Sequence, residues 1–139
     1  MIRQISYNDY DQFIQLINTN VTKEDFELFL TKNLQSGHHI ILVYEINNKI
    51  IGTGTLLIES KLTYNISYLG HIENIFVSEE YRNKGIGKEI VKCLCKYANE
   101  KECYRVDLAC EEQLIPFYKS VGFDKQIYCM SMLNKDNFK

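Results

Sequence analysis

The segment HIENIFVSEEYRNKGIGK, residues 71–88, constrains the fold more than any other part of the chain. Its first half alternates apolar and polar residues through Ile72 and Ile75, as a half-buried strand does. The stretch KEIVKCLCKYA follows, and its apolar residues recur at helical spacing. The segment therefore predicts a strand joined to an amphipathic helix by a loop that contains Gly85 and Gly87.

This loop is suited to an anion. The first turn of a helix leaves N–H groups without partners and carries the positive end of the helix dipole. Two glycines let a ligand approach the backbone, and Arg82, Lys84 and Lys88 add charge, so a pyrophosphate fits best. The spacing matches neither a Walker loop nor a dinucleotide fingerprint. The loop alone leaves open an ordinary glycine turn with basic residues in solvent.

Composition gives no sign of a nucleic-acid or membrane partner. The 139-residue chain is 45% apolar and 24% charged, with a net charge of −2, which is typical of a soluble globular protein. This length supports one core, so we expect a single domain over residues 1–139. The longest apolar stretch, residues 40–44, is far below the ~20 residues that span a bilayer, and the amino terminus has no apolar signal core. We expect no membrane span and a cytoplasmic location.

The cysteines and histidines do not form a metal-binding pattern. Five cysteines, at positions 93, 95, 103, 110 and 129, show no Cys-x-x-Cys spacing with matching histidines. Their odd number favours reduced thiols that pack as small hydrophobic side chains. His38 and His39 are interpreted as a polar turn, and His71 as a residue that satisfies a backbone hydrogen bond. We therefore expect no metal.

Periodicity predicts the order of the elements. Strands are expected over residues 1–6, 39–46, 49–60, 66–77 and 104–110, and helices over about 10–18, 22–36, 88–99 and 114–119. Asn8-Asp9 and Thr22 are the expected helix caps, Asn47-Asn48 the turn of a hairpin, and Gly122 the end of the last helix. The tail, residues 123–133, is expected to add one or two strands, and residues 134–139 to be a loose end. This order predicts an α/β (α+β) domain with a mixed sheet.

Four stretches resemble a known family. KIIGTGTLLIE, GHIENIFVSEEYRNKGIGK, CYRVDLAC and FYKSVGF occur in the order and spacing of the GNAT N-acetyltransferases. The resemblance runs from about residue 2 to 132, and residues 70–74 with Cys103-Tyr104 make it most similar to the eukaryotic glucosamine 6-phosphate N-acetyltransferase subfamily. It implies the GNAT fold, a mixed, mostly antiparallel sheet that is splayed near its middle and flanked by helices, with acetyl-CoA in the opening. It also implies direct acetyl transfer to the 2-amino group of glucosamine 6-phosphate, a step toward UDP-N-acetylglucosamine, by a homodimer whose sugar site uses both subunits.

The resemblance also implies site residues, position by position. Ile75, Phe76 and Val77 would offer backbone groups to the pantetheine and the acetyl carbonyl. The pyrophosphate would be held by Arg82, Asn83, Lys84, Gly85, Ile86, Gly87 and Lys88. Tyr118 matches a tyrosine beside the thioester sulfur that can protonate the departing thiolate. Glu73 and Asn74 match residues beside the amine, and Lys61 and Thr19 fall near contacts to the sugar phosphate.

Three positions depart from the family pattern. Asn74 stands where aspartate is usual, Ala109 replaces an aspartate, and Leu133 falls near an expected phosphate-binding arginine. An attacking amine must be neutral, so Glu73, Asp107, backbone carbonyls and water are left to place it, with no dedicated strong base. Two alternatives stay open: a GNAT enzyme for another amine, such as a polyamine, a peptide N-terminus or an aminoglycoside, and a non-catalytic acetyl-CoA-binding module.

Overall fold

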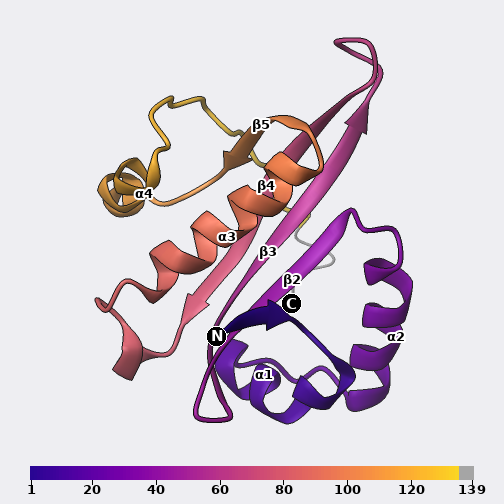
Figure 1. Ribbon diagram of the computed structural model, residues 1–139, viewed down its shortest axis with the longest axis vertical. Helices are drawn as coiled ribbons and strands as arrows, with labels where there is room; N and C mark the ends of the chain where they lie inside the picture. Colours follow the sequence, from indigo (N-terminus) through magenta and orange to yellow (C-terminus); the bar gives the residue numbers. More distant parts are fainter. Residues whose placement is uncertain (135–139) are drawn as a thin grey trace. The chain divides into compact units, whose positions relative to one another are not determined.

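The computed structural model describes residues 1–134, and the chain divides into two compact units, residues 1–108 and the residues from 109 onward. The first unit contains strands β1 (Ile2–Gln4), β2 (His39–Ile46), β3 (Lys49–Lys61), β4 (Ser67–Val77) and β5 (Cys103–Leu108) (Figure 1). Its helices are α1 (Tyr10–Ile17), α2 (Lys23–Leu34) and α3 (Ile86–Glu100). The predicted order of elements is confirmed throughout this unit.

The five strands form one sheet in the order β1-β2-β3-β4-β5. Neighbouring strands are antiparallel except β4 and β5, which run parallel and are joined through the crossover helix α3. Asn47 and Asn48, between β2 and β3, have φ angles of 49° and 63°, as a two-residue type I′ hairpin turn requires. The predicted mixed, mostly antiparallel sheet is confirmed.

Helices cover both faces of this sheet (Figure 1). On one face α3 packs so closely that a Cβ added to Gly54 would lie 2.6 Å from Cγ2 of Ile90. The buried stripe of α3 consists of Ile86, Ile90, Val91, Leu94 and Ala98. On the other face α1 and α2 lie over a second cluster, in which Ile5, Phe26, Leu30, Ile41, Val43 and Ile50 are buried. Residues two apart on a strand share a face, so beyond the register shift that follows Ile50, the odd-numbered residues Thr53, Thr55 and Leu57 of β3 belong to the α1 and α2 side.

The sheet opens beyond the middle of β4. β5 pairs with β4 only from Tyr68 to Ile72, whereas β3 pairs with β4 as far as Val77. Residues 73–77 therefore have no strand of the described chain on their β5 side, and this edge presents backbone groups that can pair with a ligand. The predicted splay of the sheet corresponds to this early end of the pairing between β4 and β5.

An ion pair ties β1 to the start of α1. Asp9 occupies the predicted N-cap position but forms no cap hydrogen bond, so the capping prediction is wrong for its side chain. Its carboxylate accepts hydrogen bonds from the Arg3 guanidinium, at 2.8 Å on each oxygen, and from the Ser6 N–H at 2.7 Å. The Thr22 prediction is confirmed, because its hydroxyl accepts from the Asp25 N–H at 3.1 Å.

The second unit contains α4 (Ile115–Val121), with Pro116 in its first turn. Gly122, at a φ of 121°, ends this helix as predicted. Residues 123–134 form no strand, so the prediction of further strands there is wrong for the described chain. A strand pattern forms a strand only when a neighbouring strand offers hydrogen-bond partners, and every strand of the described chain belongs to the first unit.

Residues 135–139, most of the predicted loose end, lie outside the described residues. The single domain over residues 1–139 stays a prediction. In the part of the chain that the structure describes, no helix combines the length and apolar character needed to cross a bilayer.

Candidate active site

A β-bulge in β4 shapes the centre of the site. Three residue steps along β4, from Glu73 to Phe76, face two steps along β3, and Asn74 within the bulge has a φ of 54°. Asparagine enters this left-handed region more readily than most residues with a side chain. The bulge redirects side chains: Glu73, Asn74 and Phe76 all line one cavity, while Ile75 lies over Gly54 on the α3 face.

This cavity lies between the sheet and the helices α1 and α2. Its volume is about 760 Å³, which is within the range of small-molecule sites. Its wall is mainly apolar, and its polar lining residues are Asn18, Thr19, Asp25, His39, Thr53, Thr55, Glu73 and Asn74. The structure thus brings together three of the four predicted acceptor residues, Thr19, Glu73 and Asn74.

The fourth predicted acceptor residue and one candidate base lie elsewhere. Lys61 ends β3 and its ammonium is 3.9 Å from Glu59, and among the described residues it is not part of the cavity wall. Both carboxylate oxygens of Asp107 accept hydrogen bonds from Arg105, at 2.8 and 3.0 Å. Asp107 is therefore already engaged and is a poor candidate for placing the amine.

The predicted anion loop is exposed and precedes α3. Gly85 has a φ of 83°, and its carbonyl accepts the first bond of the helix, from the N–H of residue 89 at 3.0 Å. The N–H groups of residues 86–88 consequently have no intrahelical partner. They lie at the positive end of a helix that is 15 residues long, where an anion is favoured.

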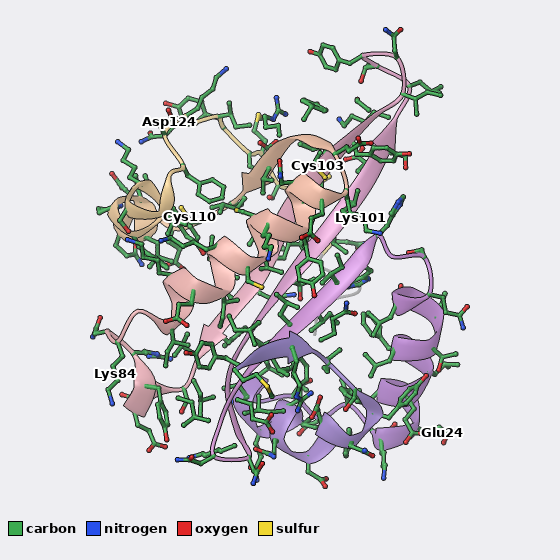
Figure 2. All side chains as sticks on the ribbon, viewed as in Figure 1. Glu24, Lys84, Lys101, Cys103, Cys110 and Asp124 are labelled. Carbon is green, nitrogen blue, oxygen red and sulfur yellow. The ribbon has the colours of Figure 1, made fainter. Side chains whose placement is uncertain are left out.

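Two basic residues of this loop have different environments. Arg82 donates from Nε to the Val77 carbonyl at 3.0 Å, which fastens the loop to the end of β4. The ammonium of Lys84 lies 5.3 Å from the centre of the Tyr81 ring, and Figure 2 marks Lys84 in the loop ahead of α3. Lys84 is exposed, so its charge can reach a ligand.

Tyr118 lies on α4 in the second unit. Its ring centre is 4.9 Å from that of Phe117 and 5.9 Å from that of Phe123. Burial, with a smaller contribution from the Cys110 thiol, raises the pKa of the Tyr118 phenol above its ordinary value. The phenol therefore stays protonated at neutral pH and can donate a proton.

The five cysteines are all free. Cys93 and Cys95 lie on α3 and Cys103 on β5, and burial raises the pKa of these three thiols. A raised thiol pKa disfavours the thiolate, which is the reactive form. These three cysteines are thus poorly suited to nucleophilic chemistry.

His39 is a cavity residue that the sequence interpretation missed. The interpretation of His39 as part of a polar turn is wrong, because it begins β2, pairs with Leu57 of β3 and lines the cavity. Its ring stands edge-on to Phe29, with centres 5.5 Å apart. The available signal was the alternation of His39 with Ile41 and Val43, which places all three on the face covered by α1 and α2.

Comparisons with known proteins show which family the chain is similar to. The sequence model of the Acetyltransferase (GNAT) family matches residues 6–123. A Drosophila melanogaster protein named "Probable glucosamine 6-phosphate N-acetyltransferase" is 37% identical over 130 residues, which are 88% of this chain and 59% of that protein. The Candida albicans glucosamine 6-phosphate N-acetyltransferase is 32% identical over 129 residues, 87% of each chain. The chain therefore spans less than two thirds of the fly relative's length.

A solved structure is similar over nearly the whole chain. The crystal structure of glucosamine-6-phosphate N-acetyltransferase from Arabidopsis thaliana superposes with a TM-score of 0.92 and 30% sequence identity, covering 96% of this chain and 97% of that one. The fold, the family match and these relatives together define the class of protein. The chain belongs to the GNAT family of acetyltransferases.

Proposed function

We propose that the protein transfers the acetyl group of acetyl-CoA to the 2-amino group of glucosamine 6-phosphate, giving N-acetylglucosamine 6-phosphate and CoA. One observation carries the proposal: on their β5 side, residues 73–77 have no partner strand in the described chain, and Glu73, Asn74 and Phe76 among them line the cavity. A donor on the edge and an acceptor in the cavity would meet at the bulge, as direct attack in a ternary complex requires. The printed names of the relatives support the choice of acceptor.

The proposed donor site consists of backbone and basic groups. The free edge of β4 at Ile75, Phe76 and Val77 suits a pantetheine arm that pairs as an added strand. A backbone N–H group near Phe76 would polarise the thioester carbonyl. The pyrophosphate would bind the first-turn N–H groups of α3 and the loop residues 82–88. Acetyl-CoA, when bound, supplies the activated acetyl group.

The proposed acceptor site is the cavity. Glu73 would orient the amine, Asn74 would contact the sugar, and Thr19 would lie near the phosphate. Lys61 is proposed as a further phosphate ligand. Its ammonium would leave the long contact with Glu59 and bind the phosphate, which carries more negative charge. The amine attacks the carbonyl carbon, the carbon–sulfur bond breaks, and Tyr118 supplies the proton that the departing thiolate takes up.

We further propose that the enzyme is a cytoplasmic homodimer of amino-sugar metabolism whose product leads toward UDP-N-acetylglucosamine. The exposed apolar side chains in the tail of the described chain, Tyr128, Met130 and Met132, support the homodimer.

The testing experiment measures thiol release from acetyl-CoA with glucosamine 6-phosphate, glucosamine, spermidine and a short peptide. We expect fast release with the phosphosugar alone. Tyr118→Phe removes the proton donor and should lower kcat by about 100-fold, the typical effect of losing a general acid. Tyr64→Phe is the matched control, because Tyr64 is 77% exposed and has no proposed role, and its kcat should equal that of the wild type.

Other outcomes separate the alternatives. Turnover of a different amine without turnover of the phosphosugar would keep the acetyltransferase mechanism and reject the substrate. Tight acetyl-CoA binding without acetyl transfer to any amine would indicate a binding module, and Tyr118→Phe would then change nothing in the assay.

A further inference from the structure

His39 and Glu73 lie on the same wall of the cavity, on the two strands that flank β3. His39 stands opposite Leu57, and Glu73 stands opposite Thr55. Leu57 and Thr55 are two residues apart on one strand, so all four side chains share a face of the sheet. The two outer strands are separated by two strand spacings, about 10 Å. Both side chains line the same cavity, so a small polar ligand bound there would lie close to the imidazole and the carboxylate.

The imidazole of His39 is available for chemistry. In residues 1–134 it forms no side-chain hydrogen bond, unlike His71, whose ring is 2.9 Å from Glu59. No polar side-chain atom of the described chain is both fully buried and unpartnered, so the His39 nitrogens are not sealed off from solvent, and the residue lines the cavity. The edge-on contact with Phe29 holds the ring in position.

Burial favours a neutral His39 ring, whereas the Glu73 carboxylate favours the charged one. The cavity wall contributes Glu73 from β4 and Asp25 from α2, and the neighbouring residue Leu57 is apolar. Burial lowers the pKa of His39 below its ordinary value, against the opposing effect of the Glu73 carboxylate. A neutral imidazole at physiological pH can accept a proton.

We propose that His39 is the proton acceptor that neutralises the acceptor's ammonium group before acetyl transfer. This inference rests on the proposed function and fills the role for which Asp107, paired with Arg105, and Ala109 are unsuited. An N–H bond of the ammonium breaks, and the proton passes to a ring nitrogen of His39, directly or through one water molecule. The freed lone pair of the amine attacks the thioester carbon, the carbon–sulfur bond breaks, and Tyr118 protonates the departing thiolate. The second proton that the nitrogen loses restores the Tyr118 phenol. His39 then returns its proton to solvent.

The test compares the pH dependence of kcat for the wild type and His39→Gln with glucosamine 6-phosphate. With His39 present, kcat should fall only when the imidazole becomes protonated at acid pH. Without it, the bound amine must lose its proton unaided, so we expect kcat at about pH 6.5 to fall by about 100-fold. The variant should recover toward alkaline pH, which moves its half-maximal pH upward by about one unit or more. Added imidazole should partly restore the rate at low pH.

His38→Gln is the matched control. His38 packs edge-on against Tyr68 and is not part of the cavity wall of the described chain, so its pH profile should match that of the wild type. A loss in His39→Gln that is equal at every pH would indicate a structural role and overturn the proposal. An unchanged profile with normal wild-type turnover would overturn the role of His39 and leave the proposed function standing.

If His39→Gln fails to fold, an NMR titration of the wild-type protein still tests the proposal. NMR titration of the imidazole signals should show His39 titrating below the ordinary histidine range, about 6.5, and shifting when glucosamine 6-phosphate binds. Signals that do not respond to saturating phosphosugar would overturn the role of His39. If the wild-type protein released no thiol with any of the amines, the proposed function would be rejected, and the role of His39 with it.

Discussion

Asn74, where the family resemblance implies an aspartate, occupies a backbone conformation that suits either residue. The bulge holds this residue at a φ of 54°, a conformation that asparagine and aspartate both tolerate better than other residues with a side chain. Asparagine therefore suits the bulge, and with it the orientation of Glu73 and Phe76 toward the cavity, and it adds no negative charge there. The amide of Asn74 cannot accept the proton of the ammonium group, so the proposed neutral base His39 has a larger part in removing it.

Gly54 is required by the packing of α3 rather than by backbone conformation. A Cβ at this position would lie 2.6 Å from Cγ2 of Ile90, 2.7 Å from Cδ1 of Ile75 and 3.0 Å from Cδ1 of Leu94. We expect Gly54→Ala to lower the free energy of unfolding by about 1–3 kcal/mol, the usual cost of overpacking a core. Urea denaturation measures the change.

Gly85→Ala is the comparison for Gly54→Ala. Nothing lies within 4 Å of a Cβ at Gly85, so only the cost of its left-handed backbone applies, about 1–2 kcal/mol. The Gly54 variant should also disturb the Ile75 side chain and the donor edge, and therefore lose activity at temperatures where the Gly85 variant stays folded. A Gly54→Ala protein as stable as the wild type would contradict the close packing of α3.

The N-terminus of α3 should bind the pyrophosphate of acetyl-CoA and no other part of that molecule. Lys84→Gln should raise the KM for acetyl-CoA by about 3- to 10-fold with kcat unchanged, because one favourable charge near a helix terminus contributes about 1 kcal/mol. S-acetylpantetheine, which has no pyrophosphate, should bind the variant and the wild type equally. Lys92→Gln, on the exposed side of the same helix, should change neither KM. An equal effect on both donors would place Lys84 outside the pyrophosphate site.

The junction of β1 and α1 should make stability depend on acid. Burial of Asp9 favours its neutral form, but hydrogen bonds from Arg3 and Ser6 outweigh it, so the pKa of Asp9 is lowered in the folded protein. A lowered carboxylate pKa contributes stability above the unfolded value of about 4 and loses it as the pH falls through the folded value. Asp9→Asn should cost about 1–3 kcal/mol at neutral pH, because Arg3 is partly exposed and keeps Glu45 as a partner, and the variant should lose less stability than the wild type between about pH 5 and 2.

Asp11→Asn is the control for Asp9→Asn, since Asp11 is exposed in the same helix. Urea unfolding at several pH values gives both comparisons. If Asp9→Asn and the wild type lost stability in parallel on acidification, the ion pair would not be the source of the acid sensitivity.

Local patterns predicted most elements because each carries its own physical signal. The Asn47-Asn48 turn, the Thr22 cap and the stripe of α3 depend on neighbours in the sequence, and all three were predicted. The cavity could not be predicted in this way, because its walls come from α1, α2 and three strands that only tertiary packing brings together. His39 was missed for that reason, and the tail strands were wrongly predicted because alternation does not show whether a pairing strand exists.

At the scale of the whole molecule, the tail carries apolar side chains that the described chain does not cover. Tyr128, Met130 and Met132 are 103%, 95% and 97% exposed. Large apolar groups gathered in one exposed segment mark an interaction surface. Burial of such surface stabilises association by about 25 cal/mol per Å² before the costs of binding are subtracted. A second copy of this chain is the partner that the proposed homodimer supplies.

The homodimer predicts that charge in the tail will separate the subunits. Met130→Asp with Met132→Asp should convert a dimer into a monomer in sedimentation velocity, because two carboxylates in an apolar contact would be buried without partners. If the sugar site uses both subunits, kcat/KM for glucosamine 6-phosphate should fall at the same protein concentrations at which the dimer dissociates. Leu28→Asp places a charge at an exposed residue of α2 and should leave both properties unchanged. A wild-type protein that sediments as a fully active monomer would show that each chain has a complete site and that the tail serves another purpose.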